Sequence, residues 1–221
     1  MYLSDDNSQV NIRNTLCEDI PKIVQLQQVS FPQMAIEGMI WKPHHLASHL
    51  ETFPQGQFVA EYEGQIIGSV SSLVVKLEPE YKNHTWTEVC GGPEFRNHNP
   101  KGDSLYGADV STHPDYRRIG IATLLYNARK NLCIKLNLRR IIAGGRLFNY
   151  CEFVDKMSPD EYIQKVIEGK IDEPVLGFQL KNGFRFIKVL QNYLKDSRSV
   201  GYATFIEWKN SNHKPGDLID N

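Results

Sequence analysis

A short run of residues near the middle of the chain has the composition of a phosphate-binding turn. After an alternating segment at 104–112, the chain reads Arg117-Arg-Ile-Gly-Ile-Ala122 and continues into an apolar helical repeat. A helix that begins here leaves its first backbone N–H groups without intrahelical partners, and its dipole adds partial positive charge there. Gly120 has no side chain to keep a ligand away from those amides. The pattern therefore predicts a socket for a phosphate or diphosphate.

The elements around this socket form a strand–helix–strand unit. Residues 104–112 alternate as a strand does, and residues 138–143 form a second short strand closed by Gly144 and Gly145. Between them, apolar residues recur at helical spacing up to a stop at Asn137. The charged residues of that helix fall mostly on its other faces: Arg129, Lys130 and Lys135. Such a crossover makes the two strands parallel.

The segment Thr112–Ala122 resembles the acyl-CoA-binding motif of the GNAT N-acyltransferase superfamily, in which x-Pro-x-x-(Arg/Gln)-x-x-Gly-x-(Gly/Ala) links a strand to a helix. Leu180–Phe184 is similar to the Gly-Phe ending of a later motif of that family, and the order of elements fits over roughly residues 9 to 208. Further segments resemble a bacterial GNAT subgroup sometimes fused to a carbon–nitrogen hydrolase domain: 103–109, 143–146, 157–162 and 174–184. At 221 residues, the chain is expected to lack that second domain.

The resemblance implies a mixed α/β (α+β) fold. We expect a twisted, mostly antiparallel sheet of about seven strands, with the parallel βαβ unit at its core and helices on both faces. A single GNAT-like domain is expected over residues 1–209, with insertions near 76–102 and 146–172. Residues 210–221 are polar and are expected to form a mobile tail.

The resemblance also implies a reaction. An N-acyltransferase, in the first instance an N-acetyltransferase, moves an acyl group directly from CoA to an amine within a ternary complex. The expected co-substrate is acetyl-CoA or another acyl-CoA, without a metal, and the acceptor is the amine of a small molecule or peptide. Domains of this type commonly dimerise, so a homodimer is one expected assembly.

The cofactor should contact two neighbouring segments. By resemblance, the strand at Val110, Ser111 and Thr112 pairs with the pantetheine arm as if with another strand, and the βαβ strands diverge beyond it. The diphosphate should lie against the socket, where guanidinium groups add charge-assisted bonds. Its residues are Arg117, Arg118, Ile119, Gly120, Ile121, Ala122 and Thr123.

The proton-transfer residues follow less directly from the sequence. Glu88 and His98 are candidates for the general base, because they lie in the first insertion, where substrate loops of the family often lie. Many members protonate the departing thiolate with a tyrosine four residues before the Gly of Gly-Phe, but this chain has Gln179 there. Tyr150 and Tyr193 are candidate substitutes, and a thiolate can also leave without a protein acid.

Two other functions stay open at this point. The missing tyrosine at Gln179 keeps open a non-catalytic acyl-CoA-binding or regulatory module. A nucleotide-binding protein is disfavoured, because the chain has no Gly-x-x-x-x-Gly-Lys-(Ser/Thr) motif. Asp109, directly before the pantetheine strand, could orient a neighbouring group.

Composition and charge exclude several classes of protein. A formal net charge of −1 provides no global basic field for nucleic acid or a membrane surface. The N-terminus lacks a signal-peptide pattern and no apolar run reaches the length of a membrane helix, so a cytoplasmic protein is expected. The four cysteines show no Cys-x-x-Cys spacing, which argues against a zinc knuckle or redox pair: Cys17, Cys90, Cys133 and Cys151.

Overall fold

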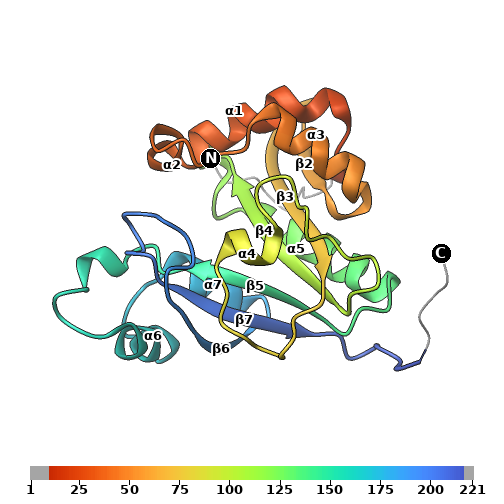
Figure 1. Cartoon of the computed structure of the whole chain (residues 1–221). Helices are drawn as coiled ribbons and strands as arrows, with labels where there is room; N and C mark the ends of the chain where they lie inside the picture. Colours follow the sequence, from red (N-terminus) through yellow and green to blue (C-terminus); the bar gives the residue numbers. More distant parts are fainter. Residues whose placement is uncertain (1–9, 217–221) are drawn as a thin grey trace.

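A seven-stranded sheet forms the centre of the computed structural model, which describes residues 10–216 (Figure 1). The strand order is β1-β2-β3-β4-β5-β7-β6, and every neighbouring pair is antiparallel except β4 and β5. The strands are β1 (Asn11–Asn14), β2 (Phe58–Tyr62), β3 (Gln65–Val75), β4 (Ser104–Thr112), β5 (Arg140–Arg146), β6 (Arg185–Leu190) and β7 (Ala203–Lys209). The predicted mixed α/β fold, with a parallel pair inside a mostly antiparallel sheet, is confirmed.

Helices cover both faces of this sheet. They are α1 (Ile20–Ser30), α2 (Pro32–Ile36), α3 (Pro43–Thr52), α4 (Trp86–Cys90), α5 (Ile121–Lys135), α6 (Pro159–Ile167) and α7 (Pro174–Lys181). Short 3-10 turns occupy Cys17–Asp19, Pro54–Gly56, Pro114–Tyr116 and Tyr150–Glu152. Figure 1 shows α1, α2 and α3 gathered at one end of the molecule, with α4 in front of the sheet and α5 behind it. Within residues 10–216, no helix has both the length and the apolar character needed to cross a bilayer.

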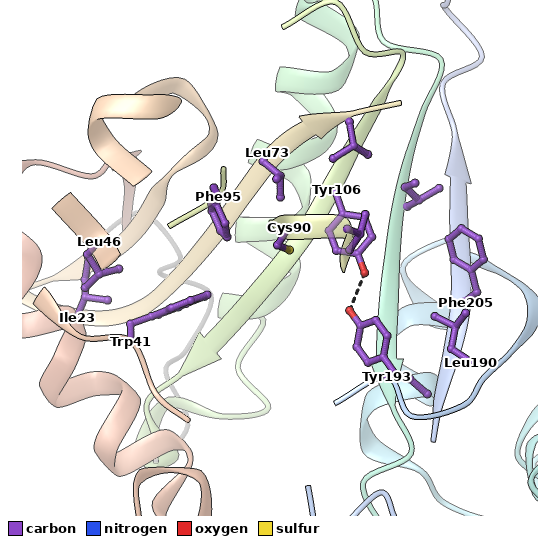
Figure 2. Close-up of a cluster of buried hydrophobic side chains, with 14 of the residues drawn as sticks. Ile23, Trp41, Leu46, Leu73, Cys90, Phe95, Tyr106, Leu190, Tyr193 and Phe205 are labelled. Atoms are coloured by element: carbon purple, nitrogen blue, oxygen red, sulfur yellow. Dashed lines mark hydrogen bonds between the residues drawn. The ribbon is translucent and has the colours of Figure 1, made fainter. Parts of the chain in front are cut away.

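The strands bury one set of side chains on each face. Leu73 and Tyr106 pack with residues of α1, α3 and α4, whereas their chain neighbours Val74 and Leu105 pack with residues of α5, α6 and α7. This alternation follows from the two-residue period of a strand. Figure 2 shows the first cluster, in which the Tyr106 hydroxyl lies 2.7 Å from that of Tyr193. The two cores hold the sheet in place between its helices.

Strands β4 and β5 separate after a short parallel contact. They pair only from Ser104 opposite Arg140 to Tyr106 opposite Ile142. The register between β3 and β4 then shifts, so that Ala108 is an extra residue between the paired Gly107 and Asp109. A bulge of this kind bends its strand and increases the local twist. Beyond Tyr106, therefore, β4 keeps β3 as its neighbour and opens a gap toward β5.

The described part of the C-terminal segment makes hydrogen bonds with the end of α5. The His213 Nδ1 atom lies 2.7 Å from the Asn137 carbonyl oxygen, and the Asn137 side chain donates to the Lys214 carbonyl at 3.0 Å. These contacts fasten the chain beyond β7 to the end of α5. Residues 217–221 of the predicted tail lie outside the described residues, as do residues 1–9.

Candidate active site

A cavity of about 310 Å³ lies where β4 and β5 separate. Both strands contribute glycine and alanine residues to its wall, and the small size of these residues leaves the space open. The side chains around the cavity come from segments far apart in the sequence: Gln27 from α1, Trp41 from the segment between α2 and α3, His45 from α3, Asp109 and Val110 from β4, Tyr126 and Arg129 from α5, Gln179 from α7, and Tyr193.

The start of α5 is open, as a phosphate socket requires. Gly120 is the N-cap residue with a φ of +94°, no side chain caps this end, and nothing lies within 4 Å of a Cβ atom built on Gly120. Arg118 also has a positive φ, of +63°. These left-handed residues turn the chain so that the first amides of α5 face outward. Thr123, in the first helical turn, is exposed beside them.

The two socket arginines differ in their contacts. The Arg117 guanidinium donates from Nη2 to the carbonyl oxygen of Ser30 at 2.9 Å, so it ties the socket loop to the end of α1. Arg118 is exposed at the mouth of the socket. Of the two, Arg118 is therefore better placed to meet a phosphate.

The predicted pantetheine strand borders the cavity through Val110. The next residue, Ser111, is buried, and its hydroxyl donates to Asp109 Oδ2 at 3.0 Å. The Thr112 carbonyl accepts a hydrogen bond from the Ser30 hydroxyl at 3.1 Å. Val110 thus borders the space where a ligand could lie, while the next two residues, Ser111 and Thr112, make hydrogen bonds within the protein.

The three predicted catalytic side chains all make structural contacts outside the cavity. Glu88 is exposed and forms a capping box at the start of α4, where its carboxylate accepts from the Thr85 amide at 2.7 Å. His98 accepts at Nδ1 from the Val74 amide at 3.1 Å. The Tyr150 hydroxyl donates to the Met157 carbonyl at 2.9 Å. The structure therefore does not bring these three residues together.

Asp109 is the carboxylate that the structure places in the cavity. Its Oδ2 accepts hydrogen bonds from Gln27 Nε2 at 2.8 Å and from the Ser111 hydroxyl. Burial raises the pKa of Asp109, and this effect outweighs the opposing hydrogen bonds and the positive charge of Arg129. A carboxylate with a raised pKa is a stronger base than an exposed one. The only sequence signal for a general base at Asp109 was its position directly before the predicted pantetheine strand.

His45 also lines the cavity, but its tautomer makes it a donor. Its Nδ1 accepts a hydrogen bond from the Lys42 amide at 3.2 Å, so the neutral ring carries its proton on Nε2. Its ring nitrogens lie within 4.8 Å of possible ligand atoms of His44 and Glu94. Metal binding at Nε2 would require the proton on Nδ1, where the Lys42 N–H already points, and Arg96 pairs with Glu94 at 2.9 Å. This trio therefore does not fit a metal in its present arrangement.

Two tyrosines lie near the position where the family commonly has an acid. The Tyr126 hydroxyl interacts with Gln179 and Arg129, which lower its pKa against the larger, raising effect of burial. Gln179 lies against Gly145, since its amide atoms would be within 2.8 Å of a Cβ built there. Tyr193, a substitute predicted from the sequence, packs its ring on Gly144 and pairs with Tyr106 (Figure 2). Tyr126 was missed because it reads as an ordinary core residue of the α5 repeat.

Known proteins resemble this chain over most of its length. It is 46% identical over 205 residues to the "Probable hydrolase YhcX" of Bacillus subtilis (strain 168), which covers 92% of this chain and 39% of that protein. It is 37% identical over 216 residues to the "Uncharacterized N-acetyltransferase YkwB" of the same organism, covering 97% and 96% of the two chains. The chain thus spans well under half of the first relative and nearly all of the second.

Solved structures share the fold. The loading GNATL domain of CurA from Lyngbya majuscula superimposes with a TM-score of 0.77 at 21% identity, covering 90% of this chain and 97% of that one. The GphF GNAT-like decarboxylase in complex with isobutyryl-CoA has a TM-score of 0.76 at 20% identity, with 90% and 98% covered. Residues 20–150 match the family described as "Acetyltransferase (GNAT) family". The predicted resemblance is thus confirmed, and the chain belongs to the GNAT acetyltransferase family.

Proposed function

We propose that the protein transfers an acyl group from CoA to an amine in a ternary complex. The diphosphate binds the open start of α5, the pantetheine arm follows Val110–Thr112, and the thioester enters the cavity beside Asp109. The observation that carries this proposal is the opening between β4 and β5, which has the uncapped helix at one side and the half-buried Asp109 carboxylate within it. Family membership and the CoA ligand named for GphF support the same placement.

The residues of the cavity suit direct transfer. The amine nitrogen attacks the thioester carbonyl carbon, and the Asp109 carboxylate takes the proton that the nitrogen must lose. A backbone N–H of β4 beyond the bulge, for which Val110 is the candidate, stabilises the developing oxyanion. The C–S bond then breaks, and the Tyr126 hydroxyl donates to the departing sulfur. The amide and CoA are the products, and return of the proton from Asp109 to the Tyr126 phenolate through solvent restores both side chains, so atoms and charge balance.

The acceptor enters from the side of the N-terminal helices. That wall of the cavity is mainly apolar, and its side chains are Phe31, Met34, Met39, Ile40 and Trp41. Apolar walls with a few polar groups are typical of sites for small molecules. We therefore propose an amine acceptor with an apolar body, either a small molecule or the end of a peptide.

The test is amine-dependent thiol release from acetyl-CoA over a panel of amines, together with calorimetry of CoA binding. The proposal predicts CoA binding and thiol release that requires an amine. Gln179 at the usual acid position favours the second candidate, an acyl-CoA-binding module without transfer. Binding without release for every amine would support that module, and absence of CoA binding would contradict both.

Changing Tyr126 to phenylalanine is expected to lower kcat about tenfold to a hundredfold while CoA affinity stays within about twofold, because only the proton donor is removed. The matched control is Tyr193→Phe, which removes another buried hydroxyl of the same cavity. That control should cost stability, about 1 kcal/mol for its lost hydrogen bond, with little effect on kcat. Steady-state kinetics and thermal unfolding measure both. Equal kcat for Tyr126→Phe and the unmodified protein would exclude Tyr126 as the acid.

A further inference from the structure

Arg129 is a buried cation at the base of the cavity. Its side chain is 2% exposed and comes from the third turn of α5. Nε donates to the Ser72 hydroxyl at 2.9 Å, and Nη2 donates to the carbonyl oxygens of Ser71 at 3.1 Å and Asp109 at 2.8 Å. These three acceptors are uncharged, and so is the Tyr126 hydroxyl, which also interacts with the guanidinium. The guanidinium is thus held in a fixed orientation by groups that do not neutralise it.

A second buried arginine provides the comparison. Arg140 is 1% exposed, and its Nη1 pairs with Glu207 at 3.0 Å and with Glu80 at 2.8 Å. Arg129 has no such ion pair with a carboxylate in the described part of the chain. The Asp109 carboxylate turns instead to Gln27 and Ser111. Burial lowers the pKa of Arg129, an effect larger than the raising effects of Tyr126 and Asp109. A buried charge without an anionic partner is costly, so an anionic ligand would relieve it.

The Nη1 side of this guanidinium borders the opening between the strands. A Cβ atom built on Gly107 would lie 2.9 Å from Arg129 Nη1 and 3.5 Å from the Ala143 Cβ. Nη1 therefore stands close to both strands at the point where β4 and β5 part. Arg129 lines the cavity together with Gly107 and Ala143, and these small residues leave room for a ligand group beside it.

We infer that the cavity prefers an acyl-CoA whose acyl group ends in a carboxylate, and that Arg129 binds this carboxylate. The inference rests on the proposed function, which directs the pantetheine arm along Val110–Thr112 toward Gly107. The acyl group beyond the thioester then points to the base of the opening, where Nη1 lies. A malonyl or succinyl group places an anion there, and a guanidinium binds a carboxylate through paired charge-assisted hydrogen bonds. Acetyl-CoA remains a substrate but has no group to reach Nη1.

The experiment compares acyl-CoAs of equal size on the full chain by calorimetry. Malonyl-CoA and isovaleryl-CoA differ in one respect, since the neutral compound has two methyl groups where the other has carboxylate oxygens. Malonyl-CoA should bind about tenfold more tightly than isovaleryl-CoA, as expected for one desolvated charge-assisted contact. Arg129→Gln should reduce this ratio to about two or less, and Arg129→Lys should keep part of it because it keeps the charge.

The ratio of the affinities of the unmodified protein for malonyl-CoA and isovaleryl-CoA decides the inference even where a variant does not fold. A ratio near one, with CoA still bound, overturns the carboxylate subsite and leaves the proposed transferase intact. A ratio near one together with a preference for amines that carry a carboxylate assigns the anion to the acceptor, and also overturns it. Absence of binding for CoA and every acyl-CoA instead contradicts the proposed function itself.

Discussion

Thr123→Glu is expected to weaken CoA binding at least about tenfold, which corresponds to about 1.4 kcal/mol. Thr123 is exposed in the first turn of α5, so the new carboxylate would face the diphosphate across the open amides. The same carboxylate should not destabilise the fold, because a negative charge near a helix N-terminus interacts favourably with the helix dipole. Calorimetry of CoA binding and thermal unfolding report the two effects separately.

The matched control for that change is Asn127→Glu. Asn127 is exposed and lies four residues later on the same face of α5, one turn away from the socket. The affinity of the Asn127→Glu variant for CoA should stay within about twofold of the affinity of the unmodified protein. Equal weakening by both substitutions would mean that the helix start does not hold the diphosphate. A change at Gly120 is a poorer test, because its φ of +94° strains any other residue.

Asp109→Asn is expected to reduce kcat by about a hundredfold or more, because the amide cannot accept the proton of the amine. The pH profile gives a second readout. Burial raises the pKa of Asp109, so activity of the unmodified protein should fall as the pH drops through that raised value, where the carboxylate becomes protonated. The Asp109→Asn variant should lose this acidic limb.

Glu88→Gln is the control for the base, since it makes the same chemical change outside the cavity. It leaves the side-chain amide oxygen as an acceptor for the Thr85 N–H at the start of α4, so both stability and kcat should change little. Kinetics over a range of pH compares the two variants. Slow turnover in Glu88→Gln, combined with normal turnover in Asp109→Asn, would restore Glu88 as the base and contradict the role of Asp109.

The strand–helix–strand unit and the open start of α5 could be predicted because local patterns determine them, and the whole fold followed from the family resemblance that these patterns carry. Strand alternation, the helical repeat and Gly120 at the turn are all signals within a few residues of one another. The helix predicted to stop at Asn137 is observed as Ile121–Lys135, and the second strand predicted at 138–143 is observed as Arg140–Arg146. The observed ends of these elements differ from the predicted ends by only a few residues, because helix caps and strand pairing determine where each element ends.

The cavity could not be predicted in this way, because its residues come together only through tertiary packing. Gln27, Trp41 and Asp109 are separated by long stretches of sequence. The three charged residues of α5 were predicted to fall mostly on other faces of the helix than the apolar one, and Arg129 is the exception, because it is buried. Arg129 is four residues after Leu125 and eight after Ile121, so it lies on the buried stripe and faces the sheet. An arginine at a core-facing position was the signal that could have identified this part of the site.

A crystal structure of the protein with bound CoA tests the central claim most directly. The account predicts diphosphate oxygens within about 3.2 Å of the backbone amides at the start of α5. It also predicts the pantetheine arm along Val110–Thr112 and the sulfur in the cavity near Asp109 and Tyr126. CoA bound elsewhere, with the start of α5 unoccupied and the opening between β4 and β5 empty, would contradict it.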